Sequence, residues 1–473
     1  MKKVLFAAAE CFPFSKAGGL ADVVGTLPAE LKKLGYDVRV IVPCHRATRE
    51  KFTLKHVLNF NISLGWRFKY VGIEEYEREG VTYYFVDNES YFGQAMYKGG
   101  TAEGEQYMFF CRAVLESLPL LGFVPDVLVA NDWHTAILPM LIKTQYGGAL
   151  QGGIKTVLAV HNLAYQGKFP FDMLADMLGI DSRYYTSEYI ESYGCANVLK
   201  AGLVFADKLV TVSPTYAEEI MYDYFADGLK GILNARRQEL TGILNGIDIK
   251  EYDPQTDAKI AANYSAADMQ GKFVCRGALM TELGFDDRSE APVISMVTRL
   301  TEQKGVDLVC TVFEELINTE DVFFVMLGSG EARYQDSFKY FEHKYPGRVK
   351  AFLYYDDALA HRIYAGSDLF LMPSKFEPCG ISQMIALRYG TLPIVRETGG
   401  LRDTVHPYNK YTGEGNGFSF NNYNAHDMLN VIRYAVSAIR DTSVRGQLMK
   451  NAMEGNFGFE SSAGKYAEVI ETL

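Results

Sequence analysis

The sequence predicts an α/β fold of two domains, each built around a parallel sheet with helices on its faces. The chain has 473 residues, 48% of them hydrophobic, which is enough for two cores of ordinary domain size. Strand-like apolar runs alternate with amphipathic helical stretches along both halves, a pattern typical of βα units. A glycine pair follows an apolar run in each half, at Gly18-Gly19 and at Gly399-Gly400. The two halves therefore look like two copies of one architecture.

Six apolar runs in each half predict the strands. In the first half they cover residues 4–9, 38–42, 81–86, 126–130, 156–160 and 209–212. In the second half they cover residues 293–297, 322–327, 349–354, 369–372, 392–395 and 417–420. The two series are separated by Leu244-Asn245-Gly246-Ile247-Asp248, then by Asp253-Pro254 and a polar stretch that runs to Gln270. These residues predict the domain crossing, with a hinge near residues 246–256 and a boundary between residues 248 and 249.

Charge and cysteine content exclude several functional classes. A net charge of -11 and a pI near 5.4 give no general attraction to nucleic acid or to an anionic membrane. The seven cysteines are scattered and contain no CxxC pair or zinc-binding spacing, which indicates a reducing compartment. No apolar run is long enough to span a bilayer, and the N-terminus does not resemble a signal peptide. We expect a cytoplasmic protein with no nucleic-acid partner and no membrane insertion.

The first glycine pair is a candidate phosphate-binding loop. Gly18 and Gly19 lie between an apolar run and a helical pattern, where backbone N–H groups and the helix dipole favour an anion, and Lys16 adds a nearby ammonium group. For an isolated glycine pair, a simple tight turn is an equally good interpretation. The loop has neither the GKS or GKT of a Walker A motif nor the GxGxxG of dinucleotide-binding folds, which counts against an ATPase and a nicotinamide enzyme.

A pair of cations follows the first strand-like run of the second half. Arg299 and Lys304 come directly after residues 293–297, and ligands of open α/β sheets bind beyond the carboxyl ends of the strands. Solvated charges at an ordinary turn remain nearly as good an interpretation. The position favours a ligand-binding role.

Glu377 follows the run at residues 369–372 and is the candidate carboxylate of the second half. It could accept sugar hydroxyls or lie near a developing positive charge, while Gly380 and Ile381 offer N–H groups at the next helix start. A nucleophilic role for Cys379 is disfavoured, because the sequence nominates no base or cation as its partner.

Polar and aromatic residues also follow two strands of the first half. His161 and Asn162 follow residues 156–160, and Asp132 lies in the Asn131-Asp132-Trp133-His134 segment after residues 126–130. The mixture of amides, hydrogen-bond donors and an aromatic face suits a carbohydrate better than a metal. No HExxH or similar spacing is present, so we predict no metal site.

Together these segments resemble the bacterial glycogen synthases and plant starch synthases, a family of retaining glucosyltransferases, along essentially the whole chain. The segments that carry the resemblance are Ser15-Lys16-Ala17-Gly18-Gly19-Leu20-Ala21-Asp22-Val23, His161-Asn162-Leu163-Ala164-Tyr165-Gln166-Gly167, Asn245-Gly246-Ile247-Asp248, Arg299 with Gln303-Lys304-Gly305, Glu377-Pro378-Cys379-Gly380 and Thr398-Gly399-Gly400-Leu401. One departure is Ala17, where bacterial members usually carry threonine.

The resemblance implies a GT-B fold, with two Rossmann-like domains facing each other across a deep cleft and a C-terminal helix crossing back. It implies an N-terminal acceptor-side catalytic domain of residues 1–248 with the returning helix 457–473, and a nucleotide-sugar-binding domain of residues 249–456. The implied reaction transfers glucose from ADP-glucose to the non-reducing 4-OH end of an α-1,4-glucan, such as glycogen, starch or a maltooligosaccharide. Configuration is retained, ADP is released, and no cofactor or metal is required. A plant chain of this kind would work in the plastid stroma.

Residue roles follow from the same resemblance. Lys16 and the Gly18-Gly19 backbone would face the donor's phosphates and glucose, Arg299 and Lys304 would hold the diphosphate, and Glu377 and His161 would hold the sugar. These five side chains are the implied catalytic set: Lys16, His161, Arg299, Lys304 and Glu377. The implied substrate-binding residues are Gly18, Gly19, Asp22, Asp132 near the acceptor, Asn162, Asn245, Tyr355 stacking on the nucleobase, Cys379, Gly380, Ile381, Thr398 and Gly399.

Two other classes remain open at this point. A nicotinamide-dependent oxidoreductase on a twin α/β scaffold would be favoured by tight NAD binding. A noncatalytic protein that binds glucan or nucleotide sugar would keep the fold without turnover. Elongation of a maltooligosaccharide by ADP-glucose distinguishes both from the glucosyltransferase.

Overall fold

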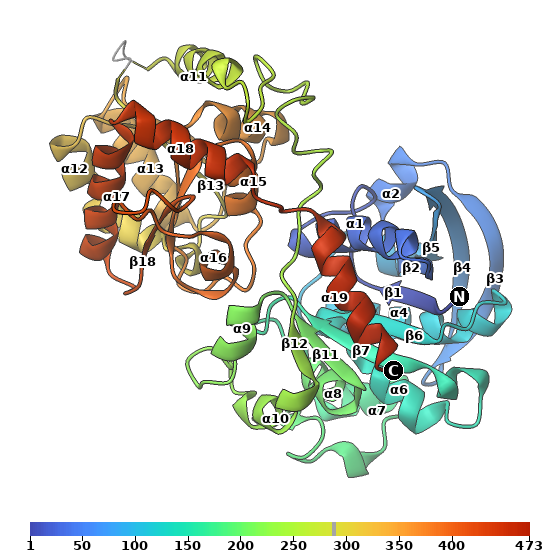
Figure 1. Cartoon of the computed structure of the whole chain (residues 1–473). Coiled ribbons are helices and arrows are strands. Elements are labelled where there is room, and N and C mark those ends of the chain that lie inside the picture. The colour runs from blue at the N-terminus through green and yellow to red at the C-terminus, as the bar shows by residue number, and fades with distance from the viewer. Residues whose placement is uncertain (286–289) are drawn as a thin grey trace. The chain divides into compact units, whose positions relative to one another are not determined.

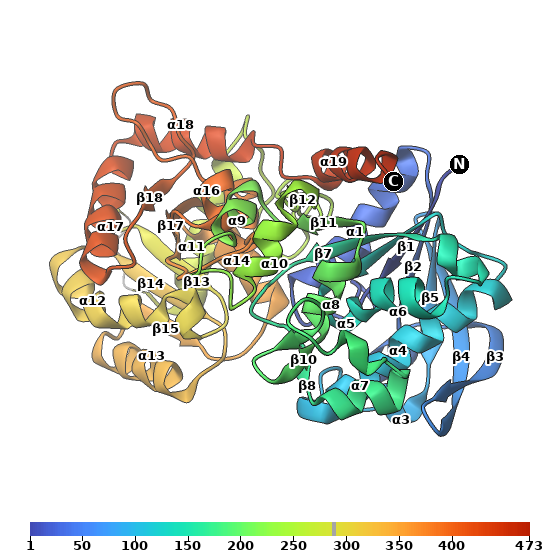
Figure 2. The same cartoon turned by 90° about the horizontal axis from the view of Figure 1, so that it is seen from below.

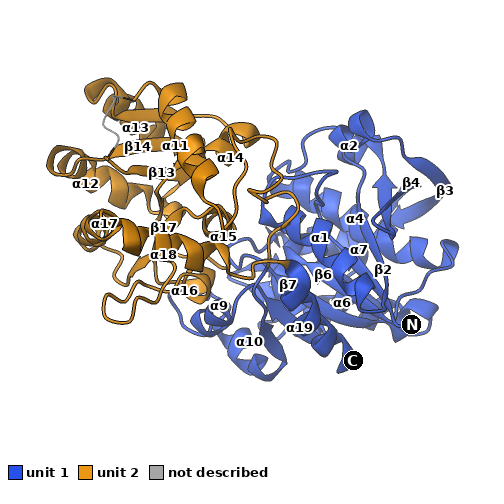
Figure 3. Ribbon diagram, turned by 45° about the horizontal axis from the view of Figure 1, so that its top comes forward, with its two compact units in different colours: residues 1–245, 459–473 blue, residues 246–458 orange. Residues whose placement is uncertain are grey.

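The computed structural model describes residues 1–285 and 290–473 and divides the chain into two compact units (Figure 3). Unit 1 comprises Met1–Asn245 and Phe459–Leu473, and unit 2 comprises Gly246–Gly458. These boundaries lie two or three residues from the predicted ones. Each unit is described by itself.

Unit 1 is built on a nine-stranded sheet with the order β12-β11-β7-β6-β1-β2-β5-β4-β3 (Figure 1). The strands are β1 (Lys3–Ala7), β2 (Asp37–Pro43), β3 (Lys55–Leu64), β4 (Arg67–Arg78), β5 (Val81–Asp87), β6 (Val127–Asn131), β7 (Lys155–Val160), β11 (Lys208–Thr211) and β12 (Leu240–Gly242). Neighbours from β12 to β5 are parallel, while β4 is antiparallel to both β5 and β3. The six predicted strands are present, with ends within two residues of the prediction.

The antiparallel β3–β4 hairpin corrects the prediction of a purely parallel sheet. Apolar and polar residues alternate along the hairpin, as in Leu58-Asn59-Phe60-Asn61-Ile62, and the polar ones are exposed, so it lacks the uniform apolar run of a strand buried on both faces. Continuous apolar runs therefore do not predict this hairpin. They also do not predict the small antiparallel sheet, which consists of β8 (Lys168–Phe169), β10 (Cys195–Asn197) and β9 (Glu191–Ser192), in that order.

Helices cover the unit 1 sheet. They are α1 (Gly19–Lys33), α2 (Arg46–Lys51), α3 (Glu89–Phe92), α4 (Gly100–Leu120), α5 (Asp132–Thr135), α6 (Ile137–Gln145), α7 (Phe171–Leu178), α8 (Val198–Phe205), α9 (Pro214–Glu219), α10 (Lys230–Ala235) and α19 (Phe459–Glu471), with short 3₁₀ turns η1 (Leu150–Gly153), η2 (Ser182–Tyr184) and η3 (Arg237–Glu239). Within the described residues, no helix of either unit combines the length and the apolar character needed to cross a membrane.

Helix α1 starts at the glycine pair and connects it to the core. Its buried apolar residues recur at helical spacing, with Asp22 in the first turn and lysines in the last, as the helix dipole favours. It packs against α19, whose Tyr466 and Ile470 are buried in the unit 1 core (Figures 1 and 2). The Ser462 hydroxyl also donates to the Leu244 carbonyl at 2.6 Å. The C-terminal helix thus belongs to the N-terminal unit.

Unit 2 has a six-stranded, fully parallel sheet with the order β15-β14-β13-β16-β17-β18. All six predicted strands are present: β13 (Val293–Val297), β14 (Phe323–Leu327), β15 (Val349–Phe352), β16 (Leu369–Met372), β17 (Leu392–Arg396) and β18 (Phe418–Phe420). The helices are α11 (Gln270–Leu283), α12 (Val306–Thr319), α13 (Ala332–Lys344), α14 (Asp357–Gly366), α15 (Ser382–Arg388), α16 (Gly399–Thr404), α17 (Ala425–Ile439) and α18 (Thr442–Met453), with a 3₁₀ turn η4 (Glu302–Lys304).

In each of the two large sheets, the chain first adds strands on one side of the first strand and then continues on its other side. In unit 1 the chain passes from β1 to β2, then forms the edge strand β3 and returns through β4 to β5, and it resumes on the other side of β1 with β6. In unit 2 it moves from β13 through β14 to β15, then resumes beside β13 with β16. Loops at the carboxyl ends of such neighbouring strands diverge and leave a crevice in which ligands bind. The site is therefore expected beyond β1 and β6 in unit 1 and beyond β13 and β16 in unit 2.

Candidate functional site

The loop after β1 brings Lys16 and the first glycine pair to the switch point of unit 1. The Lys16 ammonium donates to Asp22 Oδ1 at 2.7 Å and lies over the Phe12 ring, 5.3 Å from its centroid. The N–H groups of Ala17 and Gly18 donate to Glu10 Oε2, the latter at 3.3 Å. Two amides of the predicted phosphate loop are thus bonded to a carboxylate of the same chain in this state.

Glu10 is a residue that the sequence prediction missed. It is 3% exposed, and burial raises the pKa of its carboxyl to about 7, with smaller contributions from the charges of Asp22 and Asp132. A sequence signal existed, because Glu10 is an acidic residue immediately after the predicted strand at residues 4–9. A carboxylate there is easily taken for an exposed loop residue.

The segments after β6 and β7 meet through Asp132. Its Oδ1 accepts the N–H groups of His161 at 2.7 Å and Asn162 at 3.4 Å. Asp132 has a φ of 54°, a backbone conformation that costs energy for a residue with a side chain. Burial raises the pKa of this carboxyl to about 7. The three predicted residues Asp132, His161 and Asn162 therefore lie together at the switch point.

His161 is held as a neutral ring. Burial lowers its pKa to about 4. Its Nε2 lies 2.9 Å from Asn131 Oδ1, while the Asn131 amide nitrogen donates to the carbonyl oxygens of Ala7 and Val129. Because Asn131 Oδ1 must then be the acceptor, Nε2 of His161 carries the proton, and its Nδ1 is a hydrogen-bond acceptor.

In unit 2, Lys304 and Glu377 form an ion pair across the switch point. Lys304 Nζ lies 2.6 Å from Glu377 Oε2, and the Ser374 hydroxyl donates to the same oxygen at 2.9 Å. Both charged side chains are largely buried. Gly305, with a φ of 69°, makes this approach possible, because a Cβ there would lie 2.1 Å from the Pro373 carbonyl oxygen. The turn after β13 therefore packs directly against the segment that follows β16.

The second glycine pair supports the loop of Glu377. A Cβ on Gly399 would lie 2.0 Å from the Glu377 carbonyl oxygen, and one on Gly400 would lie 2.1 Å from that of Cys379. The Gly400 N–H donates to the carbonyls of Glu377 and Pro378, each at 3.2 Å. Close backbone packing that holds Glu377 is thus one role of this pair, and a phosphate-binding role for Gly399 remains a prediction.

The other predicted residues lie around these two centres. Thr398 is buried at the end of β17, and Cys379, Gly380 and Ile381 lead into α15, so these residues share neighbouring strand ends with Glu377. Arg299 is exposed in the turn after β13. Two residues lie farther away within their sheets: Tyr355, 75% exposed, follows β15 with β14 between it and β13, and Asn245, buried, follows the edge strand β12.

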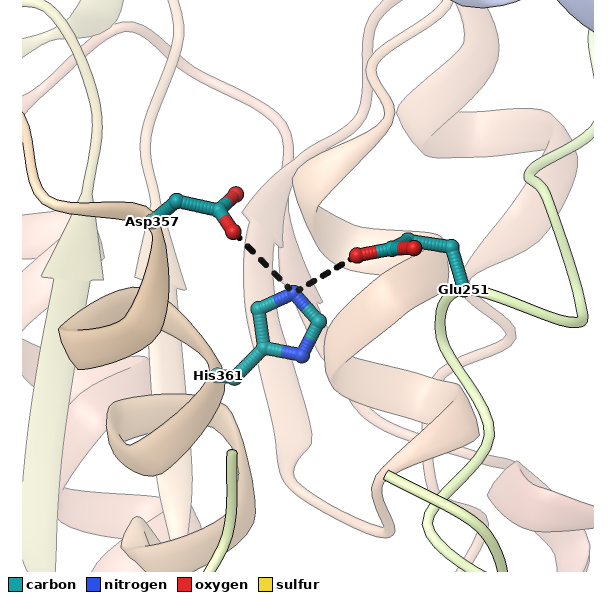
Figure 4. A group of neighbouring side chains, drawn as sticks. All are labelled: Glu251, Asp357 and His361. Atoms are coloured by element: carbon teal, nitrogen blue, oxygen red, sulfur yellow. Dashed lines mark ion pairs between the residues drawn. The ribbon is translucent and has the colours of Figure 1, made fainter. Parts of the chain in front are cut away.

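A histidine–carboxylate group in unit 2 has the composition of a metal site. Ligand atoms of Glu251, Asp357 and His361 lie within 4.8 Å of one another, and Figure 4 shows His361 Nε2 facing both carboxylates. The Lys259 ammonium already occupies this space, 2.6 Å from Glu251 Oε1, 2.7 Å from Asp357 Oδ2 and 3.3 Å from His361 Nε2. We therefore interpret the group as an ion-pair network that fastens residues 251–259 to α14, and assign no metal to it.

Comparison with known families covers both halves of the chain. Residues 3–235 match the model of the starch synthase catalytic domain, and residues 285–453 match that of glycosyl transferases group 1. A glycogen synthase of Geobacillus thermodenitrificans is 49% identical over 474 residues, covering 100% of this chain and 98% of that protein. A glycogen synthase of Bacillus cereus is 48% identical, covering 99% of each chain.

Comparison with solved structures agrees with the family models. The catalytic domain of starch synthase IV from Arabidopsis thaliana, solved with ADP and acarbose bound, superposes with a TM-score of 0.92 at 32% identity, covering 100% of this chain and 99% of that one. A sucrose-phosphate synthase from Thermosynechococcus elongatus, at 15% identity and a TM-score of 0.62, shares the fold. The predicted GT-B fold and the predicted relationship are confirmed, and the chain belongs to the glycogen synthase and starch synthase family of glycosyltransferases.

Proposed function

We propose that this enzyme transfers glucose from ADP-glucose to the non-reducing 4-OH end of an α-1,4-glucan, with retention of configuration and release of ADP. The observation that carries the proposal is the buried Lys304–Glu377 ion pair at the switch point of unit 2, in a chain 49% identical to a glycogen synthase over its whole length. A cation and a carboxylate side by side suit a reaction that creates negative charge on a diphosphate and positive charge on a sugar.

In this proposal unit 2 binds the nucleotide sugar. Arg299 and Lys304 neutralise the diphosphate as it leaves, and Glu377 accepts hydroxyls of the glucose. Tyr355, an exposed ring at the end of β15, stacks on the adenine. The backbone around Gly380 and Thr398 completes the donor site.

Unit 1 supplies the acceptor side. Lys16 adds a third cation for the leaving phosphate. Nδ1 of the neutral His161 accepts a sugar hydroxyl, which an imidazolium could not do. Asp132 accepts hydrogen bonds from the backbone N–H groups of His161 and Asn162. Its main contribution is therefore to hold this segment in place beside the acceptor.

The reaction balances without a cofactor. The bond between the anomeric carbon and the diphosphate oxygen breaks, and the acceptor O4 bonds to the same face of that carbon. The O4 proton passes to the departing phosphate, so neither a covalent enzyme nucleophile nor a metal ion is needed. All seven cysteines, which lie within the described residues, are free thiols, which supports a place in the reducing cytoplasm.

The test is elongation of a defined maltooligosaccharide with ADP-glucose or UDP-glucose as donor, in the presence and absence of a chelator. We expect longer chains with ADP-glucose, weaker activity with UDP-glucose, no effect of the chelator, and a new α-linkage by proton NMR. Glu377→Gln should lower kcat by at least about 100-fold, because it removes the charge at the reacting centre. If neither ADP-glucose nor UDP-glucose supported elongation, the proposal would be refuted, and a noncatalytic binding protein would remain.

A further inference from the structure

One buried carboxylate next to the proposed site has no part in the mechanism above. Glu10 lies beyond the carboxyl end of β1, and its Oε2 accepts the N–H groups of two consecutive residues, Ala17 and Gly18. These residues immediately follow Lys16, so Glu10 touches the backbone that aims the Lys16 side chain.

The remainder of the loop shows why this contact matters. Cys11 and Ser15 close a tight turn through two backbone hydrogen bonds, and α1 begins at Gly19. Between these two fixed points, Glu10 tethers the amides of Ala17 and Gly18. Glu10 therefore holds the backbone that follows Lys16, while Asp22 holds the Lys16 ammonium in this structure.

The neighbouring strand uses the same arrangement. Asp132, directly after β6, accepts the N–H groups of the consecutive residues His161 and Asn162. Strands β1 and β6 are adjacent in the sheet. Two buried carboxylates at the ends of neighbouring strands thus each accept hydrogen bonds from two consecutive backbone amides. In both cases the amides belong to a segment that takes part in the proposed reaction.

We propose that Glu10 is a positioning residue, which holds the Ala17 and Gly18 amides and so directs the Lys16 ammonium toward the leaving phosphate. The inference rests on the proposed function for the part that concerns turnover, and on the hydrogen bonds alone for the part that concerns the loop. A small misplacement of a catalytic group is enough to cost about 100-fold in rate.

The test compares Glu10→Ala and Glu10→Gln in the full-length protein. Hydrogen exchange at Ala17 and Gly18 reports the clamp without requiring activity, and kcat reports its consequence. Glu10→Ala should speed exchange at both amides by at least about 10-fold and lower kcat by about 100-fold. Glu10→Gln keeps an acceptor oxygen and should restore protection and most of kcat. In a Lys16→Ala background, Glu10→Ala should lower kcat little further, because both act through the same ammonium.

Asp207→Ala is the matched control. Asp207 Oδ2 accepts the N–H of Thr156 at 2.8 Å, but it does so at the amino ends of the strands, away from the proposed site. This variant should leave kcat and exchange at Ala17 and Gly18 unchanged. An equal loss of kcat in the control would overturn the inference, as would unchanged exchange in Glu10→Ala or a Glu10→Gln variant as impaired as Glu10→Ala. If the wild type shows no elongation, the proposed function fails, while exchange at the two amides still decides whether Glu10 clamps the loop.

Discussion

Replacing Glu10 by glutamine should stabilise unit 1 at neutral and alkaline pH, and should stabilise it much less in acid. The reason is that burial opposes ionisation of this carboxyl and raises its pKa from 4.5 to about 7. A group whose pKa is higher in the folded state binds more protons there than in the unfolded state. The wild type therefore loses stability as pH rises through the interval from about 4.5 to about 7.

The size of this loss follows from the shift in the Glu10 pKa. Raising the pKa of this carboxyl from 4.5 to about 7 corresponds to about 3 kcal/mol of lost stability. The full penalty applies at pH 8, whereas about 1 kcal/mol applies at pH 5, where the carboxyl is still protonated in the folded state. The neutral glutamine does not pay this cost. Its advantage in the free energy of unfolding should therefore shrink from about 3 to about 1 kcal/mol between pH 8 and pH 5.

Urea unfolding followed by tryptophan fluorescence measures this quantity for the right part of the chain. Both tryptophans, Trp66 and Trp133, belong to unit 1, and Trp133 is buried against Phe169 and Tyr107. Glu468→Gln, which removes an exposed carboxyl from α19 of the same unit, is the control and should not reproduce the effect. A Glu10→Gln variant no more stable than the wild type at pH 8, or an advantage that is the same at pH 5, would refute the reasoning.

Two further predictions concern the ion pair and the packing of α1. Lys304→Met should lower kcat by at least about 100-fold, because it removes one of the cations proposed to neutralise the leaving group and leaves the buried Glu377 carboxylate without its ion-pair partner at 2.6 Å. Lys304→Arg keeps the charge and should retain more activity, so equal rates for the two variants would contradict this explanation. Gly25→Ala should destabilise unit 1 by about 1–3 kcal/mol in urea unfolding despite the better helix propensity of alanine, because its Cβ would lie 2.3 Å from the Phe12 carbonyl oxygen. Gly464→Ala in α19 is the control: its Cβ would meet no neighbour within 4 Å, and the variant should stabilise the unit by up to about 1 kcal/mol. If Gly25→Ala were stabilising too, the Phe12 backbone would have to move away from the new methyl group at no cost, and the prediction would be wrong.

Most of the fold was predictable because buried parallel strands leave a strong local signal. The runs that became β1 and β13 are continuous apolar segments followed by helical patterns, and this alternation identifies βα units without any tertiary information. The β3–β4 hairpin was not predictable in the same way. One of its faces is exposed, and polar residues such as Asn59 and Asn61 alternate there with apolar ones, so its sequence lacks the continuous apolar run that identified the other strands.

The candidate site was partly predictable for the same reason. Lys304 and Glu377 each follow an apolar run, and ligands of α/β folds gather at the carboxyl ends of strands. That these two residues, 73 positions apart, form one buried ion pair is a tertiary fact. It depends on β16 lying beside β13, an order that local periodicity does not specify.

By itself the sequence determined the α/β class, the strand ends that carry the polar residues, and the family. These follow from periodicity, from spacing along the chain and from whole motifs, which are properties of single segments. Only the tertiary structure decided what holds those residues in place: the carboxylate of Glu10 on the Ala17 and Gly18 amides, and the close approach of Gly400 to the backbone of the Glu377 loop. Hydrogen bonds and backbone contacts act over about 3 Å between segments that the fold brings together, and no pattern within one segment records its partner in another.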